Sequence, residues 1–139
     1  MVNGNAADNP EKMTLYVNGP SGGTLSWNTV SDARLKTDIV PIPEALEKVL
    51  GLQGVLFSWK ETEMQGIGRQ MGFVAQQAES VIPEVVSYKG DRYSMQYAPI
   101  TALLVEAIKE QQQIIEQKEV EMDALKARLD RLEKLILTD

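Results

Sequence analysis

The chain of 139 residues contains no histidine and no cysteine. Without histidine there is no imidazole base, which excludes a Ser-His-Asp triad. Without cysteine there is no thiol nucleophile, no disulfide framework and no cysteine-bound zinc site. Any hydrolytic chemistry must therefore use serine, threonine, lysine or carboxylate side chains.

Long apolar runs and an excess of basic residues are also lacking. No apolar stretch approaches the roughly 20 residues that span a bilayer, and no charged-then-apolar signal peptide opens the chain. Lysine and arginine number 14 against 20 aspartate and glutamate residues, so the net charge of -6 disfavours a nucleic-acid surface. With no EF-hand-type loop either, we expect no nucleic-acid or membrane partner, no metal and no cofactor.

The first part of the chain is too short to bury a core of its own. Polar residues 1–12 precede two β-type runs, Met13–Val17 and Thr24–Trp27, which are separated by a segment rich in glycine and proline. Such a segment is typical of turns. We expect these runs to be the end of a larger β structure, or strands that other chains complete.

The middle of the chain predicts a small mixed domain. Two prolines favour an extended backbone over Thr37–Pro43, because a residue before proline avoids the helical region. Pro43 and Gly51 are placed to begin and end a short amphipathic helix. The elements that we expect are a helix over 44–50, strands over 55–60 and 70–74 around a hairpin tip at 61–68, a helix over 76–81, and a hairpin of 85–88 with 92–95.

The last third predicts one long helix, because Pro99 to Leu137 contains no glycine and no internal proline. At 1.5 Å per residue it would be roughly 60 Å long. A seven-residue repeat fits the whole stretch and predicts a left-handed coiled coil. Its a positions are Thr101, Ile108, Ile115, Met122, Leu129 and Ile136, and its d positions are Leu104, Gln111, Lys118, Leu125 and Leu132.

The partner of this helix is expected to be the same helix from other copies, because no second long helix exists to cover the stripe. Mixed residues at a and polar residues at d differ from the Ile-a/Leu-d pattern of two-stranded coils, which favours a trimer. Gln111 and Lys118 have two interpretations. They form either a weak, partly hydrated section of the helix or a polar layer that fixes the register.

The remaining nucleophile and base to consider are serine and lysine, since Ser-Lys variants of the triad exist on unrelated folds. Ser31 and Lys36 lie in one short segment where the composition changes. By spacing alone, this pair is more simply a helix N-cap serine with a solvated lysine.

The surrounding sequence resembles the intramolecular chaperone auto-processing domain, a family found at the C-terminus of phage tail fibres, tailspikes and endosialidases. The resemblance covers Ser31 to Glu110, and several ordered motifs are more specific than one pair of residues. These motifs are Ser31–Ile39 (SDARLKTDI), Leu46–Leu52, Phe57–Lys60 (FSWK), Gly72–Glu79 (GFVAQQAE), Ile82–Val86 (IPEVV), and Tyr97 with Leu103–Glu110 (LLVEAIKE).

The resemblance implies a domain that trimerises, templates the folding of an upstream β-structured fibre, and then cuts itself off before the serine of the motif. Here that bond is Val30–Ser31, with Ser31 as nucleophile and Lys36 as base; Asp32 and Arg34 match the flanks of the motif and are assigned positioning roles. The family implies a virion protein precursor, made in the bacterial cytoplasm, from which the chaperone part is released. The trimer core would comprise Leu104, Ile108, Gln111, Ile115, Met122, Leu125, Leu129, Leu132 and Ile136.

The predicted fold is α+β. A short β stalk stub and linker (residues 1–30) precedes a small mixed domain with hairpin arms (31–98), and the coiled-coil helix follows (99–139). Two alternatives stay open. One is a structural trimerisation cap that remains attached and does not cleave. The other is a membrane- or DNA-linked regulator, which the acidic charge and the lack of a membrane span disfavour.

Overall fold

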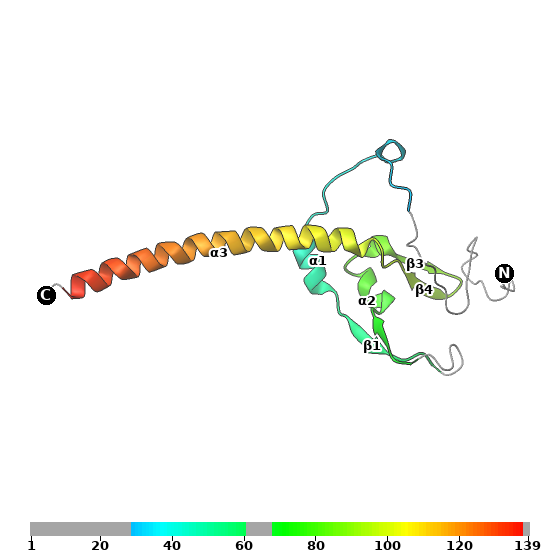
Figure 1. The fold of residues 1–139 in the computed structure, drawn as a ribbon. Coiled ribbons are helices and arrows are strands. Elements are labelled where there is room, and N and C mark those ends of the chain that lie inside the picture. Colours follow the sequence, from blue (N-terminus) through cyan, green and yellow to red (C-terminus); the bar gives the residue numbers. More distant parts are fainter. Residues whose placement is uncertain (1–28, 61–67, 138–139) are drawn as a thin grey trace. The chain divides into compact units, whose positions relative to one another are not determined.

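The protein is described from a computed structural model, which describes residues 29–60 and 68–137. The predicted strands at 13–17 and 24–27, and residues 61–67 of the hairpin tip predicted at 61–68, lie outside these residues. The described part is mixed α+β, with two small hairpins and one long C-terminal helix (Figure 1), as the sequence predicts. The elements are η2 (Ala33–Leu35), α1 (Ala45–Gly51), β1 (Val55–Phe57), β2 (Gln70–Gly72), α2 (Ala75–Glu79), η3 (Pro83–Val85), β3 (Val86–Lys89), β4 (Arg92–Met95) and α3 (Ile100–Ile136).

The chain divides into two compact units. One combines the described residues up to Pro41 with those of Leu52–Tyr97, and the other combines Ile42–Gly51 with the chain from Ala98 onward. The second unit therefore groups α1 with α3, across almost fifty intervening residues. The domain boundaries expected at 30/31 and 98/99 stay predictions.

Two antiparallel hairpins form the sheet structure of the first unit. In β1–β2, Val55 lies opposite Gly72. In β3–β4, Lys89 lies opposite Arg92, so Gly90 and Asp91 make a two-residue turn. Both turn residues have positive φ, 58° and 62°, the conformation that tight hairpin turns require.

A short helix packed on a long one forms the second unit. Figure 1 shows α1 beside the first turns of α3. The residues of these two helices that are removed from solvent are Ala45, Ile100, Leu103 and Ala107. Every described residue of α3 from Gln111 onward is exposed. The chain itself therefore covers only the beginning of its longest helix.

Several boundaries differ from the sequence-based expectations. Both strands of the first hairpin are three residues long rather than the six and five expected. The middle helix begins one residue early and ends at Glu79, before a separate 3-10 turn. The expectation of an extended backbone throughout Thr37–Pro43 is wrong at Asp38, whose φ is 52°. Among the described residues, no helix combines the length and apolar character needed to cross a membrane.

Candidate functional site

The segment 31–36 bends so that its two ends meet. Asp32 is the N-cap of η2, and its Oδ1 accepts a hydrogen bond from the backbone N–H of Arg34 at 2.9 Å. The backbone N–H of Lys36 then closes the turn on the carbonyl of Ala33 at 3.1 Å. As a result, Lys36 Nζ lies 2.7 Å from Ser31 Oγ, within hydrogen-bond distance. The two residues proposed from the sequence are therefore in contact.

The guanidinium of Arg34 engages the carboxylate of Asp32. Arg34 Nε lies 3.1 and 3.0 Å from the two carboxylate oxygens. The side-chain hydrogen bond from Arg34, followed by that from its backbone N–H, lowers the pKa of Asp32. The cap therefore stays ionised at neutral pH. This pairing also directs the Asp32 carboxylate toward Arg34, and no described carboxylate forms an ion pair with Lys36.

Apolar residues of the segment that carries the Ser31–Lys36 pair are open to solvent. Val30, which supplies the carbonyl before Ser31, is 79% exposed, and Leu35 is 75% exposed. Ile39 and Val40 are exposed as well. A hydroxyl, an amine and the peptide carbonyl of Val30 thus belong to one short segment. Nothing among the described residues of this chain shields them from water.

The predicted coiled-coil stripe lies along α3. Its apolar members from Leu104 to Ile136 are all exposed. Gln111 and Lys118 lie on the same stripe, and Lys118 Nζ pairs with Glu121 at 2.8 Å. The residues that α1 covers, Leu103 and Ala107, occupy other heptad positions. The stripe is therefore left free for a partner.

One contact that the sequence analysis missed joins β2 to the segment before α3. The Tyr97 hydroxyl oxygen accepts a hydrogen bond from the backbone N–H of Phe73 at 3.0 Å, and the two rings are 5.7 Å apart. A Cβ on Gly72 would lie 2.5 Å from that hydroxyl, so a larger residue there would have to displace the Tyr97 side chain. Gly72, Phe73 and Tyr97 all belong to the motifs quoted above. Their presence in those motifs is the sequence feature that could have pointed to this contact.

A second missed contact involves Glu110 on α3. Its carboxylate accepts hydrogen bonds from the backbone N–H groups of Ala45 and Leu46, at 3.0 and 2.8 Å. These bonds cap the beginning of α1. Glu110 lies within a quoted motif, but no local pattern points to its distant partner.

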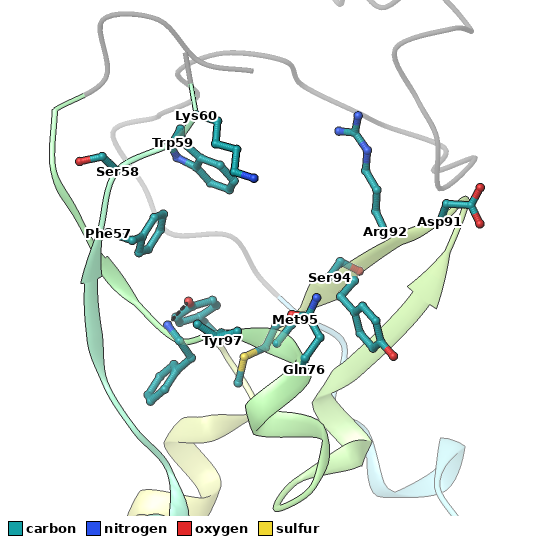
Figure 2. A pocket seen from close by; sticks show the side chains of 14 residues that line it. Phe57, Ser58, Trp59, Lys60, Gln76, Asp91, Arg92, Ser94, Met95 and Tyr97 are labelled. Carbon is teal, nitrogen blue, oxygen red and sulfur yellow. Dashed lines mark hydrogen bonds between the residues drawn. The ribbon is translucent and has the colours of Figure 1, made fainter. Parts of the chain in front are cut away.

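A pocket of about 870 Å³ lies in the first unit. Figure 2 shows Phe57 and Trp59 on one side of it and Arg92 and Met95 of β4 on the other. Phe57 and Trp59 meet edge to face, with ring centroids 5.3 Å apart. Trp59 is 46% exposed and so is not a core residue within one chain. The charged residues that line the pocket are also exposed. None of these charged groups is therefore removed from water in the way that would change its reactivity.

Over residues 29–60 and 68–137, no group of three acidic, histidine or cysteine side chains is arranged to hold a metal ion. The chemistry available at Ser31 and Lys36 is that of a hydroxyl and an amine. In Ser-Lys hydrolases, a hydroxyl and an amine paired in this way act as nucleophile and general base.

Comparison with known proteins gives two findings. Residues 31–87 match the Peptidase_S74 family, described as chaperone of endosialidase. The long tail fiber protein Gp37 of Enterobacteria phage K3 is 38% identical over 85 residues, which are 57% of this chain and 7% of that protein. Gp37 of Enterobacteria phage T2 has the same identity over the same length, 6% of its own chain. The chain thus spans a small part of the length of both relatives.

The matched segment begins at Ser31, the residue that Lys36 contacts. It ends in β3, after the Gly72–Phe73 motif that Tyr97 secures. These matches confirm the family resemblance drawn from the sequence: residues 31–87 are similar to the chaperone of endosialidase, and the findings fit a C-terminal chaperone domain of phage fibres.

Proposed function

We propose that this chain is a C-terminal intramolecular chaperone that trimerises and templates the folding of an upstream phage fibre or tailspike. The family match and the tail fibre relatives support the chaperone role. In this proposal the fibre is part of the virion, the precursor is made in the bacterial cytoplasm, and the chaperone part leaves after cleavage.

Trimerisation is assigned to the apolar stripe of α3. A helix of 37 residues with an apolar stripe needs a partner along its length, and α1 covers only its beginning. Two further copies of α3 would bury this stripe in a parallel coiled coil. The same association would bring three upstream chains together at their ends, as an intertwined fibre requires.

We assign self-cleavage at the Val30–Ser31 bond to the Ser31–Lys36 pair, and the 2.7 Å contact is the observation that carries this assignment. Neutral Lys36 takes the hydroxyl proton of Ser31 while Oγ attacks the carbonyl carbon of Val30. The C–N bond then breaks, the nitrogen of Ser31 takes a proton and becomes a free amine, and the Val30 acyl group becomes an ester on Oγ. Water hydrolyses that ester, leaving a carboxylate on Val30. The chain itself supplies the proximity of nucleophile and target.

Lysine acts as a base only when it is neutral, and removal from water favours its neutral form. Ser31 and Lys36 are exposed in one chain, and so are the apolar residues Val30, Leu35, Ile39 and Val40 of the same segment. We therefore propose that the assembled trimer shields this segment. Cleavage would then follow assembly.

The second candidate is a trimerisation cap that stays attached to its fibre. The stripe on α3 favours it, because that surface accounts for assembly without any chemistry. The two candidates differ only in the fate of the Val30–Ser31 bond.

Intact-protein mass spectrometry after expression distinguishes them. Self-cleavage predicts a wild-type product that begins at Ser31, which Ser31→Ala and Lys36→Ala both abolish. Ser58→Ala and Lys60→Ala, at an exposed serine and lysine elsewhere in the same unit, are the matched controls and should cleave normally. Wild type that stays intact as a folded trimer after long incubation would favour the cap.

The trimer and the chaperone role have separate tests. Light scattering should give the mass of three chains at micromolar concentration, and a monomer would refute the trimer. Deleting 31–139 should leave the upstream fibre unassembled or insoluble. A fibre that folds normally without these residues would contradict the chaperone role.

A further inference from the structure

The last part of α3, orange to red in Figure 1, carries charged residues on both sides of its apolar stripe. Every a and d position from Met122 to Ile136 is apolar. The e and g positions of the heptad lie on either side of that stripe. They hold four exposed charged residues, which are Glu121, Lys126, Arg128 and Glu133. Charges at e and g determine the partner and the orientation of coiled-coil helices, so these side chains can decide how copies of α3 associate.

A parallel arrangement brings opposite charges together at these positions. In a parallel coiled coil in register, each g residue faces the e residue of the next heptad on the neighbouring chain. Glu121 would then face Lys126 of a second copy. Arg128 would likewise face Glu133. Both pairs join opposite charges, and both recur at each interface of a trimer.

Contacts within one chain leave these side chains accessible. Lys118 Nζ lies 2.8 Å from Glu121 Oε2, and Gln117 Nε2 donates to Glu121 Oε1 at 3.3 Å. Lys126 Nζ lies 3.4 Å from Asp123 Oδ1. The other two of the four have no salt bridge to any described residue of their own chain. All of these groups lie on the exposed surface of one helix, where a second copy can reach them.

The earlier part of the stripe holds no comparable pairs. There the g and e positions that would face each other are Ala107 with Gln112, and Ile114 with Glu119. Neither pair joins opposite charges. The charges that distinguish one arrangement of the helices from another therefore lie in residues 121–133.

Antiparallel arrangements fit this part of α3 less well, because e then faces e and g faces g. One antiparallel alignment of the stripe places Lys126 opposite its own copy. The alignment that instead joins opposite charges places Leu129 opposite Lys118 of the second copy, which sets a charged amine against an apolar residue. In the parallel register, polar d residues face only one another and the apolar layers stay apolar.

We infer that residues 121–133 of α3 are the surface by which three copies of this chain recognise one another, parallel and in register, through ion pairs between the g residue of one chain and the e residue of the next. The inference rests on the proposed trimerisation. A single exposed ion pair contributes little. Here two pairs recur at three interfaces, and every misaligned register loses them all.

Charge reversal tests the pairing of Glu121 with Lys126. The variants are Glu121→Lys, Lys126→Glu and the double variant, each in the full chain with Ser31→Ala so that no sample can cut itself. Each single reversal sets like charges against each other between chains, and the double variant restores opposite charges. Within one chain the double variant does the reverse, because it opposes like charges in the contacts with Lys118 and with Asp123.

We expect each single reversal to lower the melting temperature of the trimer by about 3–6 °C, and the double variant to recover most of that loss. The differences should shrink as added salt screens the charges. Asp130→Lys and Arg131→Glu make the same changes of charge at b and c positions and are the controls, which should stay closer to the parent chain. A double variant less stable than both single variants would refute the pairing between chains.

An introduced cysteine tests the orientation, since the chain has no cysteine of its own. Parallel copies in register bring Ile136 of each chain into one layer, where Cα atoms can approach within the roughly 7 Å that a disulfide requires. Ile136→Cys should therefore give a disulfide-linked pair of chains on a non-reducing gel. Asp130→Cys, at an outer b position, is the control and should give none.

The remaining outcomes overturn different claims. A trimer of Ile136→Cys that forms no disulfide refutes the parallel register. A double charge variant that recovers nothing refutes the ion pairs and leaves the proposed trimer standing. A parent chain that light scattering shows to be a monomer refutes the proposed trimer itself.

Discussion

The contact between Ser31 and Lys36 and the contact between Glu110 and α1 are of opposite kinds. The first joins residues five apart in the sequence, and a single 3-10 turn is enough to form it. The second joins residues 64 and 65 apart and exists only when α1 lies on α3. Local structure alone can thus bring two side chains together, while the docking of one helix on another depends on residues far apart in the chain.

The largest expected effect concerns the local contact. Lys36→Arg keeps a donor near Ser31, but arginine is not deprotonated in proteins and cannot serve as a base. We expect cleavage to fall by about 10²–10⁴-fold, the usual contribution of general base catalysis. Intact mass over time measures it, with Lys60→Arg as the control. Cleavage at the wild-type rate would mean that Lys36 only donates a hydrogen bond.

The next effect concerns the proposed contacts between chains, which differ from the local and the long-range contacts within one chain. Leu125→Ala removes a d-position side chain, and such a truncation in a packed core costs about 2–5 kcal/mol. Val120→Ala is the matched control, because Val120 lies at the outer f position and is 72% exposed. Thermal melting should separate the two variants clearly. Equal melting temperatures would place the interface on another face of α3.

A smaller effect tests a long-range contact within one unit. Gly72→Ala would put a Cβ 2.5 Å from the Tyr97 hydroxyl. Such overpacking typically costs about 1–3 kcal/mol. Combining it with Tyr97→Phe should recover part of that loss, since the hydroxyl causes the clash. Chemical denaturation of the single and double variants measures the coupling, and purely additive losses would argue against the contact.

The smallest effect is a pH dependence. The pKa of Glu110 is lowered in the folded chain by the N–H groups of Leu46 and Ala45 and by nearby Lys48. Its stabilising effect is therefore fully present above the ordinary carboxyl pKa and is lost as the pH falls through the lowered value. Thermal melts across the acid range should show this loss in wild type and a weaker dependence in Glu110→Gln. Identical profiles would assign acid sensitivity to other carboxylates.

Sequence reasoning placed the features that depend on neighbours along the chain. The motif around Ser31 and the uninterrupted helix from Pro99 to Leu137 both follow from local residue types. The lengths of the strands do not follow from local residue types, because the residues that pair in a short hairpin depend on the elements against which it packs. Tyr97 against Gly72 and Glu110 on α1 were missed for the same reason: their partners lie 24 or more residues away. The coiled-coil assembly and the Val30–Ser31 cleavage stay predictions, because they involve other chains and a chemical step.

The part of α3 beyond Glu110 buries no residue against the rest of the described chain. Its stability would therefore depend on the concentration of the chains that associate with it. Every described residue from Gln111 onward is exposed, so association must provide what the chain does not. In the proposed uncut precursor, the fibre would hold three such helices at a high effective concentration, because joining them to one object makes their meeting intramolecular. Cutting at Val30–Ser31 would end that tether. The released trimer would then dissociate on dilution, while the fibre, already folded, would not.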